Sequence, residues 1–334
     1  MLNIGVIGYG YWGPNILRNF NTIEGVKVIS VCDRDVKALQ RAKKAAFGID
    51  FVSDYREITD SRSIDVVAIV TPVSTHYDIA KRSLKNGKHV FVEKPFTVKS
   101  SQAEELIVLA QKKKLTIMVD HTFLFTDAVC KIKELVNSNV LGDLYYYDST
   151  RINLGLFQHD VNIIWDLAPH DLSIMDFVLK EKPVAITALG TSHFNKKLED
   201  TAYIVAHFNN NMIAHFNMNW LSPVKVRTTL IGGEKRMLVW NDLESDEKIK
   251  VYDKGVKLKN TEGIYNLLVE YRSGDMYSPH INQVEALKSE TEYFIKCVLN
   301  SQVPINDGYA GLRIVRMLEA ADRSLKAAGR KVKL

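Results

Sequence analysis

The sequence lacks the features that mark several classes of protein. Its 334 residues include only three cysteines, widely spaced and without a CxxC pair, which argues against a zinc ribbon or a disulfide framework and favours a reducing, cytoplasmic setting. Its apolar runs are no longer than strands, and its N-terminus has no basic segment or cleavage signal, so neither a membrane span nor export is predicted. The net charge of +5 forms no basic block, so nucleic acid is not an expected partner. The histidines show no HExxH-type spacing, and no metal site is predicted.

What the sequence does contain is a regular alternation of strand and helix signals over residues 1–120, which predicts a parallel sheet flanked by helices. In residues 121–334 consecutive alternating strands follow one another with short turns, such as the asparagine triplet at 209–211, which predicts a second domain with a large, mostly antiparallel open sheet. The expected fold class is α/β, with the second domain of α+β type. Helices are expected at 11–20, 35–46, 77–85, 101–113, 127–137, 170–179, 283–299 and 308–328, and strands at 2–8, 26–31, 65–70, 89–92, 115–119, 144–152, 185–191, 202–208, 212–220, 226–231 and 237–240. Residues 242–280 are expected to hold one strand and irregular chain.

A glycine-rich turn joins the first expected strand to the first expected helix. Gly8, Gly10 and Gly13 form a GxGxxG pattern there, with Tyr11 and Trp12 inside it. In this setting the first glycine permits a tight turn, the second lets the backbone approach a pyrophosphate, and the third allows the helix to pack closely on the strand. The free N–H groups of the helix N-terminus face the phosphates. The pattern predicts that residues 1–120 form a dinucleotide-binding Rossmann domain, with an ordinary glycine turn as the alternative.

Asp33, at the end of the second expected strand, bears on the choice of cofactor. A carboxylate at this place accepts hydrogen bonds from the adenosine ribose hydroxyls and repels the 2′-phosphate of NADP, so NAD is the expected cofactor. Arg34 keeps NADP open, because a guanidinium pairs well with a phosphate, although it can equally lie over the adenine ring. The alternative for Asp33 is a helix cap.

Lys94 follows the expected strand at 89–92, between Glu93 and Pro95. Ligands of an open parallel sheet bind beyond the carboxyl ends of its strands, so Lys94 is expected near the nicotinamide end of the cleft. A solvated lysine is the alternative.

Asp166 and His170 stand four positions apart, and Pro169 indicates that a helix begins near them. They either converge on one ligand, or Asp166 caps the helix and His170 is structural. Oxidation of a carbinol requires an acceptor for the hydroxyl proton, and a neutral imidazole, whose ordinary pKa is about 6.5, is suited to that task. A lysine ammonium stabilises oxygen as charge develops on it.

The order of these motifs resembles that of a known family, the glucose–fructose oxidoreductase, inositol dehydrogenase and rhizopine-catabolism (Gfo/Idh/MocA) oxidoreductases. The resemblance extends over nearly the whole chain, and the ordered set is far more specific than any single motif. The matching residues are 8–13, Asp33, Thr71, Pro72, His76, 93–95, 166–170 and the C-terminal run 307–324.

The resemblance implies roles for these residues. Thr71, Pro72 and His76 resemble the loop that contacts the cofactor's ribose and pyrophosphate, although His76 has a structural alternative. Glu93 and Lys94 resemble nicotinamide-side residues, with Lys94 also reaching the substrate. The predicted catalytic residues are Lys94, His170 and Asp166; the predicted cofactor contacts are Gly8, Gly10, Tyr11, Trp12, Gly13, Asp33, Arg34, Thr71, Pro72, His76, Glu93 and Lys94. Residues 121–334 resemble a substrate-binding and oligomerisation domain, which implies a homo-oligomer (a dimer or tetramer) and an active site between the two domains.

Three further polar residues are less clear from the sequence. Arg151 and Asn153 end an expected strand and either bind a substrate phosphate or carboxylate or are solvated, so the predicted substrate contacts are Lys94, Arg151, Asn153, Asp166 and His170. His121 stands where many family members carry other residues, which leaves its role open.

The predicted function is an NAD-dependent dehydrogenase of a sugar alcohol. The region around residues 120–123 and 165–173 resembles enzymes of surface-polysaccharide pathways that oxidise the 3-hydroxyl of a UDP-N-acetylhexosamine or UDP-N-acetylhexosaminuronate. The positive net charge and a possible anion contact at Arg151 favour such a nucleotide sugar. The alternatives are a dehydrogenase of a free sugar or inositol, an NADPH-linked keto-sugar reductase, and a regulator that senses the dinucleotide without turnover.

Overall fold

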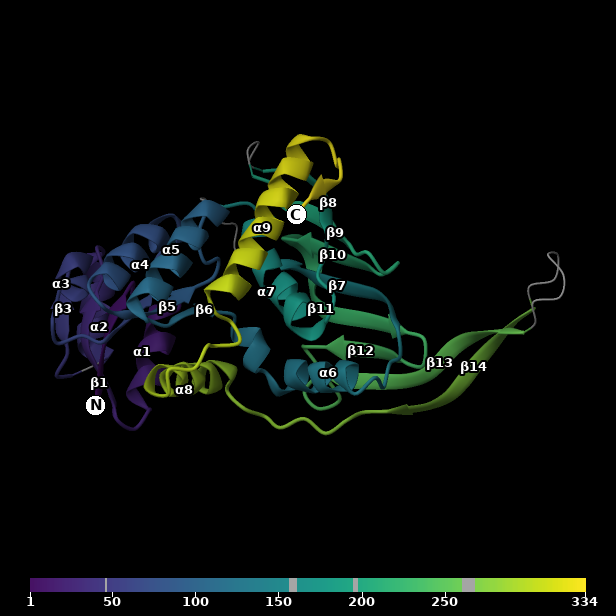
Figure 1. Ribbon diagram of the computed structural model, residues 1–334, viewed down its shortest axis with the longest axis horizontal. Coiled ribbons are helices and arrows are strands. Elements are labelled where there is room, and N and C mark those ends of the chain that lie inside the picture. The colour runs from purple at the N-terminus through teal and green to yellow at the C-terminus, as the bar shows by residue number, and fades with distance from the viewer. Residues whose placement is uncertain (46, 156–160, 195–197, 260–267) are drawn as a thin grey trace. The chain divides into compact units, whose positions relative to one another are not determined.

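The computed structural model describes residues 1–45, 47–155, 161–194, 198–259 and 268–334, and these form two compact units (Figure 1). The first unit contains Met1–Phe125 together with Val284–Arg316, and the second contains Thr126–Gln283 together with Met317–Leu334. A segment from near the end of the chain therefore belongs to the N-terminal unit, an arrangement that the local sequence pattern does not reveal.

The first unit is built on a six-stranded parallel sheet in the order β3-β2-β1-β4-β5-β6. Its strands are β1 (Leu2–Ile7), β2 (Val26–Cys32), β3 (Asp50–Val52), β4 (Val66–Ile69), β5 (His89–Glu93) and β6 (Ile117–Asp120). Its helices are α1 (Gly13–Asn21), α2 (Val36–Ala45), α3 (Tyr55–Thr59), η1 (Val73–Thr75), α4 (His76–Lys85), α5 (Ser100–Lys113), η2 (Thr122–Phe125), α8 (Ala286–Leu299) and the beginning of α9 (Gly308–Lys326). The predicted parallel sheet is confirmed, but β3 and α3 were not predicted, because both are too short to show a period.

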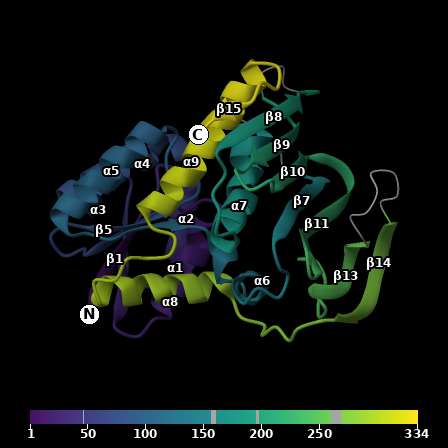
Figure 2. The same cartoon turned by 45° about the vertical axis from the view of Figure 1, so that its right-hand side comes forward.

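Burial explains why the central strands of this sheet read as continuous apolar runs. All four residues of β4 are buried, as expected for a strand covered on both faces. Helix α4 lies beside α5, and α1 lies beside α8 (Figure 2). Phe294 of α8 packs 5.4 Å from the ring of Phe91 on β5, which in turn lies 5.5 Å from Phe20 of α1. The C-terminal segment thus completes the core of the first unit.

The second unit is built on a nine-stranded sheet in the order β14-β13-β12-β11-β7-β10-β9-β8-β15. Among the described strand pairs β7 and β10 run parallel and the others run antiparallel, which confirms the predicted mostly antiparallel sheet. Its strands are β7 (Leu144–Leu154), β8 (Ala185–Thr191), β9 (Thr201–His207), β10 (Ile213–Asn219), β11 (Leu221–Gly233), β12 (Met237–Asn241), β13 (Ile249–Lys259), β14 (Leu268–Tyr277) and β15 (Val332–Lys333), and its helices are α6 (Asp127–Asn137), α7 (Ile163–Val178) and the end of α9.

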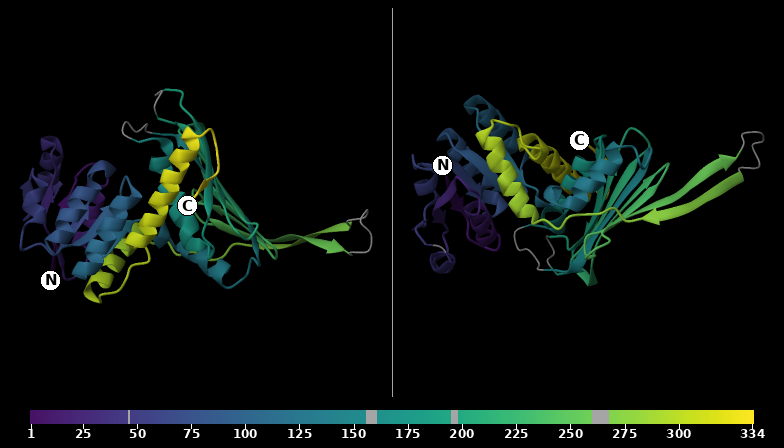
Figure 3. Two further views of the ribbon diagram at one scale, coloured as in Figure 1. Left: turned by 45° about the horizontal axis from the view of Figure 1, so that its top comes forward. Right: turned by 90° about the horizontal axis from the view of Figure 1, so that it is seen from below.

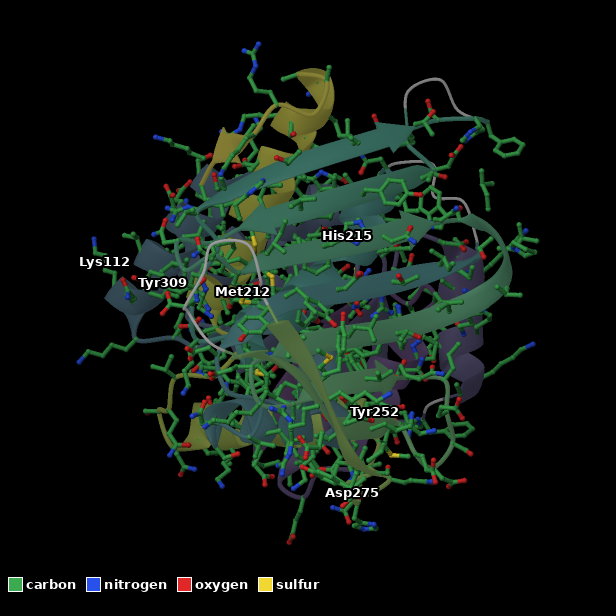
Figure 4. All side chains as sticks on the ribbon, turned by 90° about the vertical axis from the view of Figure 1, so that its right-hand side faces the viewer. Lys112, Met212, His215, Tyr252, Asp275 and Tyr309 are labelled. Carbon is green, nitrogen blue, oxygen red and sulfur yellow. The ribbon has the colours of Figure 1, made fainter. Side chains whose placement is uncertain are left out.

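One face of this sheet packs against α7, and the opposite face is turned to the viewer in Figure 4, where His215 is labelled. Side chains alternate accordingly along β10, where Ala214 and Phe216 are buried and His215 between them is partly exposed. The asparagine triplet behaves as predicted at the turn between β9 and β10, because Asn211 takes a φ of 59°, a conformation that asparagine tolerates well.

Two sequence-based predictions for the second unit are wrong. The described part of residues 242–280 contains two strands rather than one, since β13 and β14 pair in antiparallel register and extend beyond the other strands (Figure 3). Five consecutive residues of β14, 273–277, are all exposed although successive side chains of a strand point to opposite faces, so no one-sided hydrophobic alternation marks this strand. Helix α7 begins at Ile163 rather than near 170, and Pro169 lies inside it.

No helix in the described part of the chain is both long and apolar enough to cross a membrane.

Candidate active site

The glycine-rich turn lies between β1 and α1, and its geometry requires at least two of the three glycines. Gly8 has a φ of +103°, and a Cβ there would lie 2.4 Å from the carbonyl oxygen of Val70. A Cβ at Gly13 would lie 2.5 Å from the carbonyl oxygen of Gly8, so the third glycine does allow the close helix–strand packing predicted for it. Around Gly10 a Cβ would meet no atom within 4 Å, which leaves the backbone open for a close approach by a ligand.

The residues between these glycines lie ahead of the helix rather than in it. Helix α1 begins at Gly13, and not at 11 as predicted, with Trp12 as its N-cap residue. Trp12 makes no side-chain capping hydrogen bond, so no side chain of the cap occupies the first N–H groups of the helix. Tyr11 is 82% exposed, and its ring meets that of Trp12 edge-on at 5.4 Å.

A pocket of about 370 Å³ opens beside this turn in the first unit. Its lining consists of Ile7, Gly8, Gly10, Cys32, Asp33, Arg34, Asp35, Ser53, Tyr55, Val70, Thr71, Pro72, Ser74, Thr75 and Ile79. Six of the predicted cofactor contacts therefore meet around one cavity, at the carboxyl ends of β1, β2 and β4: these are Gly8, Gly10, Asp33, Arg34, Thr71 and Pro72. This cradle fits the adenosine and phosphate groups of a dinucleotide.

Sequence reasoning missed several residues of this pocket. Ser53 and Tyr55 come from the short β3–α3 segment that no pattern revealed, and Ser74 and Thr75 lie in the 3₁₀ turn η1. The Thr75 hydroxyl donates a hydrogen bond of 2.7 Å to the Thr71 hydroxyl. The signal that points to this turn is its position directly after the buried strand β4.

Asp33 braces the glycine turn and does not cap a helix. Its Oδ2 accepts a 2.6 Å hydrogen bond from the backbone N–H of Tyr9, and its Oδ1 accepts one of 2.8 Å from the N–H of Asp35. The cap-like contact at the start of α2 belongs to Asp35, whose Oδ1 accepts from the N–H of Lys37. The helix-cap alternative for Asp33 is therefore wrong. Each carboxylate oxygen keeps a further lone pair for a hydroxyl donor.

His76 is buried and contacts backbone on both sides of its ring. Its Nε2 lies 2.7 Å from the carbonyl oxygen of Thr71, and its Nδ1 lies 2.9 Å from the carbonyl oxygen of Pro95. Burial holds the pKa of His76 below its ordinary value, which favours a neutral ring that donates to one of the two carbonyls. With 1% of its surface exposed, His76 links the Thr71 loop to the Lys94–Pro95 loop, and the contacts described for it support its structural alternative.

Lys94 follows β5 directly, at the carboxyl end of the sheet, and is half-buried. Its backbone N–H donates to Oε2 of Glu93 at 3.2 Å. Glu93 is buried and stands opposite Asp120 in the register of β5 with β6. A third buried carboxyl group, that of Glu290 on α8, accepts a 3.1 Å hydrogen bond from the backbone N–H of His121.

These three carboxyl groups form the least expected feature of the first unit. Burial, and next the charge of Asp120, raise the pKa of Glu93 and the pKa of Glu290 well above the ordinary range. Sequence reasoning did not find Asp120 or Glu290, because a lone carboxylate in a strand end or a helix carries no pattern. In the described part of the chain no three histidine, cysteine or acidic side chains are arranged to hold a metal ion.

Asp166 and His170 lie one turn apart on α7 in the second unit, so both are on the same side of the helix, and both are half-buried. The N-cap of α7 is Asn162, whose Oδ1 accepts from the N–H of Trp165 at 3.2 Å. The alternative that Asp166 caps the helix is therefore wrong, although its position in the first turn is favourable for a carboxylate.

Arg151 on β7 is buried and paired. Its Nε lies 2.7 Å from Oδ2 of Asp171 and its Nη2 lies 2.9 Å from Oδ1, so the two residues form a bidentate ion pair that ties α7 to the sheet. Ser149 adds a 3.2 Å hydrogen bond to the same carboxylate. The solvated alternative for Arg151 is wrong, because its Nε–Nη2 edge is paired with Asp171 in the buried interior. Asn153, two residues further along β7, is half-buried.

A parallel sheet with a glycine-rich phosphate turn, an acidic residue at the end of β2 and an adjoining pocket defines a dinucleotide-binding protein. Residues 2–121 match a family model described as an oxidoreductase family with an NAD-binding Rossmann fold, and residues 129–239 match the GFO/IDH/MocA C-terminal domain. The chain belongs to the Gfo/Idh/MocA family of oxidoreductases. It is an enzyme whose cofactor is NAD, which sets aside the alternative of a sensor without turnover.

Several relatives are similar to the chain along different shares of their length. UDP-N-acetylglucosamine 3-dehydrogenase of Acidithiobacillus ferrooxidans is 26% identical over 318 residues, which is 94% of each chain. Its solved structure gives a TM-score of 0.79 at 23% identity, over 98% of each chain. An uncharacterised oxidoreductase of Streptococcus pneumoniae is 25% identical over 231 residues, 64% of this chain and 61% of that relative. The structure of GenD2 from gentamicin A biosynthesis, in complex with NAD, gives a TM-score of 0.82 at 19% identity, over 100% of this chain and 96% of that one.

Proposed function

We propose that this enzyme oxidises the 3-hydroxyl of a nucleotide sugar, such as a UDP-N-acetylhexosamine or a UDP-N-acetylhexosaminuronate, with NAD as the hydride acceptor. The observation that carries the substrate is the alignment with a UDP-N-acetylglucosamine 3-dehydrogenase over 94% of both chains. A free sugar or inositol is the second candidate, because an inositol 2-dehydrogenase of Salmonella typhimurium is 26% identical over 54% of this chain.

The first unit supplies the residues proposed to hold NAD. The open backbone at Gly10 and the uncapped N–H groups of α1 suit the pyrophosphate, and the carboxylate of Asp33 suits the ribose hydroxyls. Thr71 and Pro72 line the same pocket. Arg34 is exposed at its rim, where its charge faces the adenine end.

The proposed chemistry divides between three side chains. NAD accepts the hydride from the carbinol carbon when it is bound. Lys94 stabilises the oxygen as charge develops on it, and His170 accepts the hydroxyl proton. Asp166, one turn before His170 on the same helix, is proposed to bind the sugar. The division into a dinucleotide-binding domain at 1–120 and a substrate-binding domain at 121–334, with the active site between them, stays a prediction.

The pairing of Arg151 with Asp171 changes the argument for a nucleotide sugar. Beside the resemblance and the positive net charge, the sequence-based case used Arg151 as a receptor for phosphate or carboxylate, and its Nε–Nη2 edge is paired with Asp171. The substrate proposal therefore depends on the long alignment and not on this cation.

A substrate panel tests the proposal directly. Purified protein with NAD is mixed with UDP-N-acetylglucosamine, UDP-N-acetylgalactosamine, their uronates, free hexoses or myo-inositol, and NADH fluorescence is recorded. Adding 2-oxoglutarate in parallel samples recycles cofactor that stays bound. We expect turnover with at least one UDP-sugar; turnover of a free sugar or inositol without any response to UDP-sugars would contradict the nucleotide-sugar proposal.

We also propose that the chain forms a homo-oligomer through the sheet face shown in Figure 4. That face carries Tyr203, which is 44% exposed and stacks on His215 at 6.0 Å. Light scattering should report a dimer or tetramer, and Tyr203→Lys should shift it toward the monomer; a wild-type monomer would contradict the proposal.

A further inference from the structure

The three buried carboxyl groups behind Lys94 come from three different elements of the first unit. Glu93 ends β5, Asp120 ends β6 and Glu290 lies on α8. They are 9%, 3% and 0% exposed. Asp120 stands opposite Glu93 in the register of β5 with β6, and its charge contributes to raising the pKa of both glutamates.

Hydrogen bonds between carboxyl groups require a proton, because two ionised carboxylates are both acceptors. Oε1 of Glu290 accepts from the backbone N–H of His121 at 3.1 Å and from Nδ2 of Asn306 at 2.9 Å. Oε2 of Glu290 is buried without a donor in the described part of the chain. The single proton of the Thr122 hydroxyl goes to Oδ1 of Asp120 at 2.5 Å. A proton on Oε2 of Glu290 turns its contact with Asp120 into a hydrogen bond and removes the cost of an unpaired buried charge.

The groups that face this cluster come from every element packed around it. Lys94 follows Glu93 on the turn after β5, and His121 and Thr122 lie at the end of β6 and the start of η2. Asn306 precedes α9 and also donates to the carbonyl oxygen of Val119 on β6 at 2.7 Å. Glu290 therefore anchors the end of β6 through backbone and side chain together.

We propose that Glu290 is a positioning residue for the Lys94 edge of the sheet, and that it does this work in its neutral, proton-carrying form. The neutral carboxyl group holds Asp120 beside Glu93, and so fixes the strand end from which Lys94 projects. This inference rests on the proposed role of Lys94 for its consequence in catalysis, but its protonation state is independent of the substrate.

The carboxyl proton of Glu290 should affect how the free energy of unfolding depends on pH. The pKa of Glu290 is raised in the folded protein, so the folded state keeps a proton that the unfolded state loses above its ordinary pKa of about 4.5. The stability contributed by this group is complete below that pH and declines as pH rises toward the folded pKa. Glu290→Gln keeps the shape and an acceptor for His121 and Asn306 without a titrating proton, so it should remove this decline.

Chemical unfolding followed by circular dichroism, at pH values from about 5 to 8, measures the decline. We expect Glu290→Gln to gain stability relative to the wild type as pH rises, with a flatter profile. Glu292→Gln is the matched control, since Glu292 lies on the same helix with an exposed side chain 3.8 Å from Lys288, and it should keep the wild-type slope. An unchanged slope in Glu290→Gln, or a loss of stability that grows with pH, would overturn the proposal.

Turnover of the best panel substrate supplies the second readout. Glu290→Ala should lower it by about tenfold or more through misplacement of the Lys94 edge, and Glu290→Gln should recover most of that loss. Equal losses in both variants would show that ionised Glu290 is needed and would overturn the proposal. If no panel substrate reacts, the unfolding profiles still decide the protonation state, so failure of the proposed function is distinguishable from failure of this inference.

Discussion

Each unit buries ionisable side chains, and the two units compensate the cost of burial in different ways. In the second unit Arg151 and Asp171 neutralise each other through two hydrogen bonds in one plane. In the first unit the carboxyl groups of Glu93, Asp120 and Glu290 are buried together, and burial and then the charge of Asp120 raise the pKa of both glutamates. A guanidinium–carboxylate pair holds its geometry across the whole physiological pH range, whereas a carboxyl cluster holds its geometry only while it keeps a proton.

The difference has a consequence for the two helices concerned. The ion pair fixes α7, the helix that carries Asp166 and His170, to strand β7 through the guanidinium of Arg151, which stays charged at physiological pH. The cluster fixes the end of β6 beside Lys94 through Glu290, whose pKa burial raises well above its ordinary value. The account therefore expects alkaline conditions to disturb the Lys94 edge before they disturb α7.

The largest expected effect comes from breaking the ion pair. Arg151→Ala leaves the Asp171 carboxylate buried without its cation and should cost about 3–5 kcal/mol in the free energy of unfolding. Tryptophan fluorescence in urea suits this measurement, because Trp165, Trp220 and Trp240 lie in the second unit. Arg227→Ala is the control: its side chain is 34% exposed and lies 3.4 Å from Asp242, so its loss should cost less than about 1 kcal/mol. Similar losses of stability in both variants would contradict the distinction between the buried ion pair and the partly exposed one.

The next largest effect is expected on turnover, from a change at His170 on α7, the helix that the ion pair holds. His170→Asn should lower turnover by about 10² or more and change its dependence on pH, because the proton acceptor is lost while α7 stays in place. His280→Asn, at an exposed position, should leave both unchanged. A wild-type rate across the pH range in His170→Asn would make His170 structural and would require another acceptor.

A smaller effect is expected in the cofactor pocket. NAD should bind more tightly than NADP, and Asp33→Asn should narrow the gap by about tenfold, since it removes the repulsion of the 2′-phosphate. The variant keeps an acceptor for the Tyr9 N–H, which Asp33→Ala would also lose. Asp35→Asn, at the neighbouring carboxylate of the same pocket, is the control. Calorimetric titration with both dinucleotides gives the answer, and equal affinities in the wild type would contradict the assignment to Asp33.

The features that were predictable from sequence depend on residues close together in the chain. The glycine turn requires Gly8 and Gly13, because a Cβ at either position would lie only 2.4–2.5 Å from a backbone carbonyl oxygen. The buried strands are recognisable in the sequence as apolar runs. The partners of Arg151 and of the His121 backbone are 20 and 169 positions away, and no local pattern announces them. The start of α7 was misplaced because Pro169 signals a helix start in general, while here the buried surroundings hold the helix together through it. Strand β14 was missed because its residues 273–277 are all exposed and show no one-sided alternation.

Lys94 offers the most direct test of the central claim, that this enzyme uses a lysine at the carboxyl end of β5 to oxidise a sugar alcohol. The measurement is the turnover of Lys94→Ala with the best panel substrate, compared with its affinity for NADH by fluorescence titration. The account predicts that turnover falls by about 10² or more while NADH affinity stays close to that of the wild type. Wild-type turnover in Lys94→Ala would contradict it.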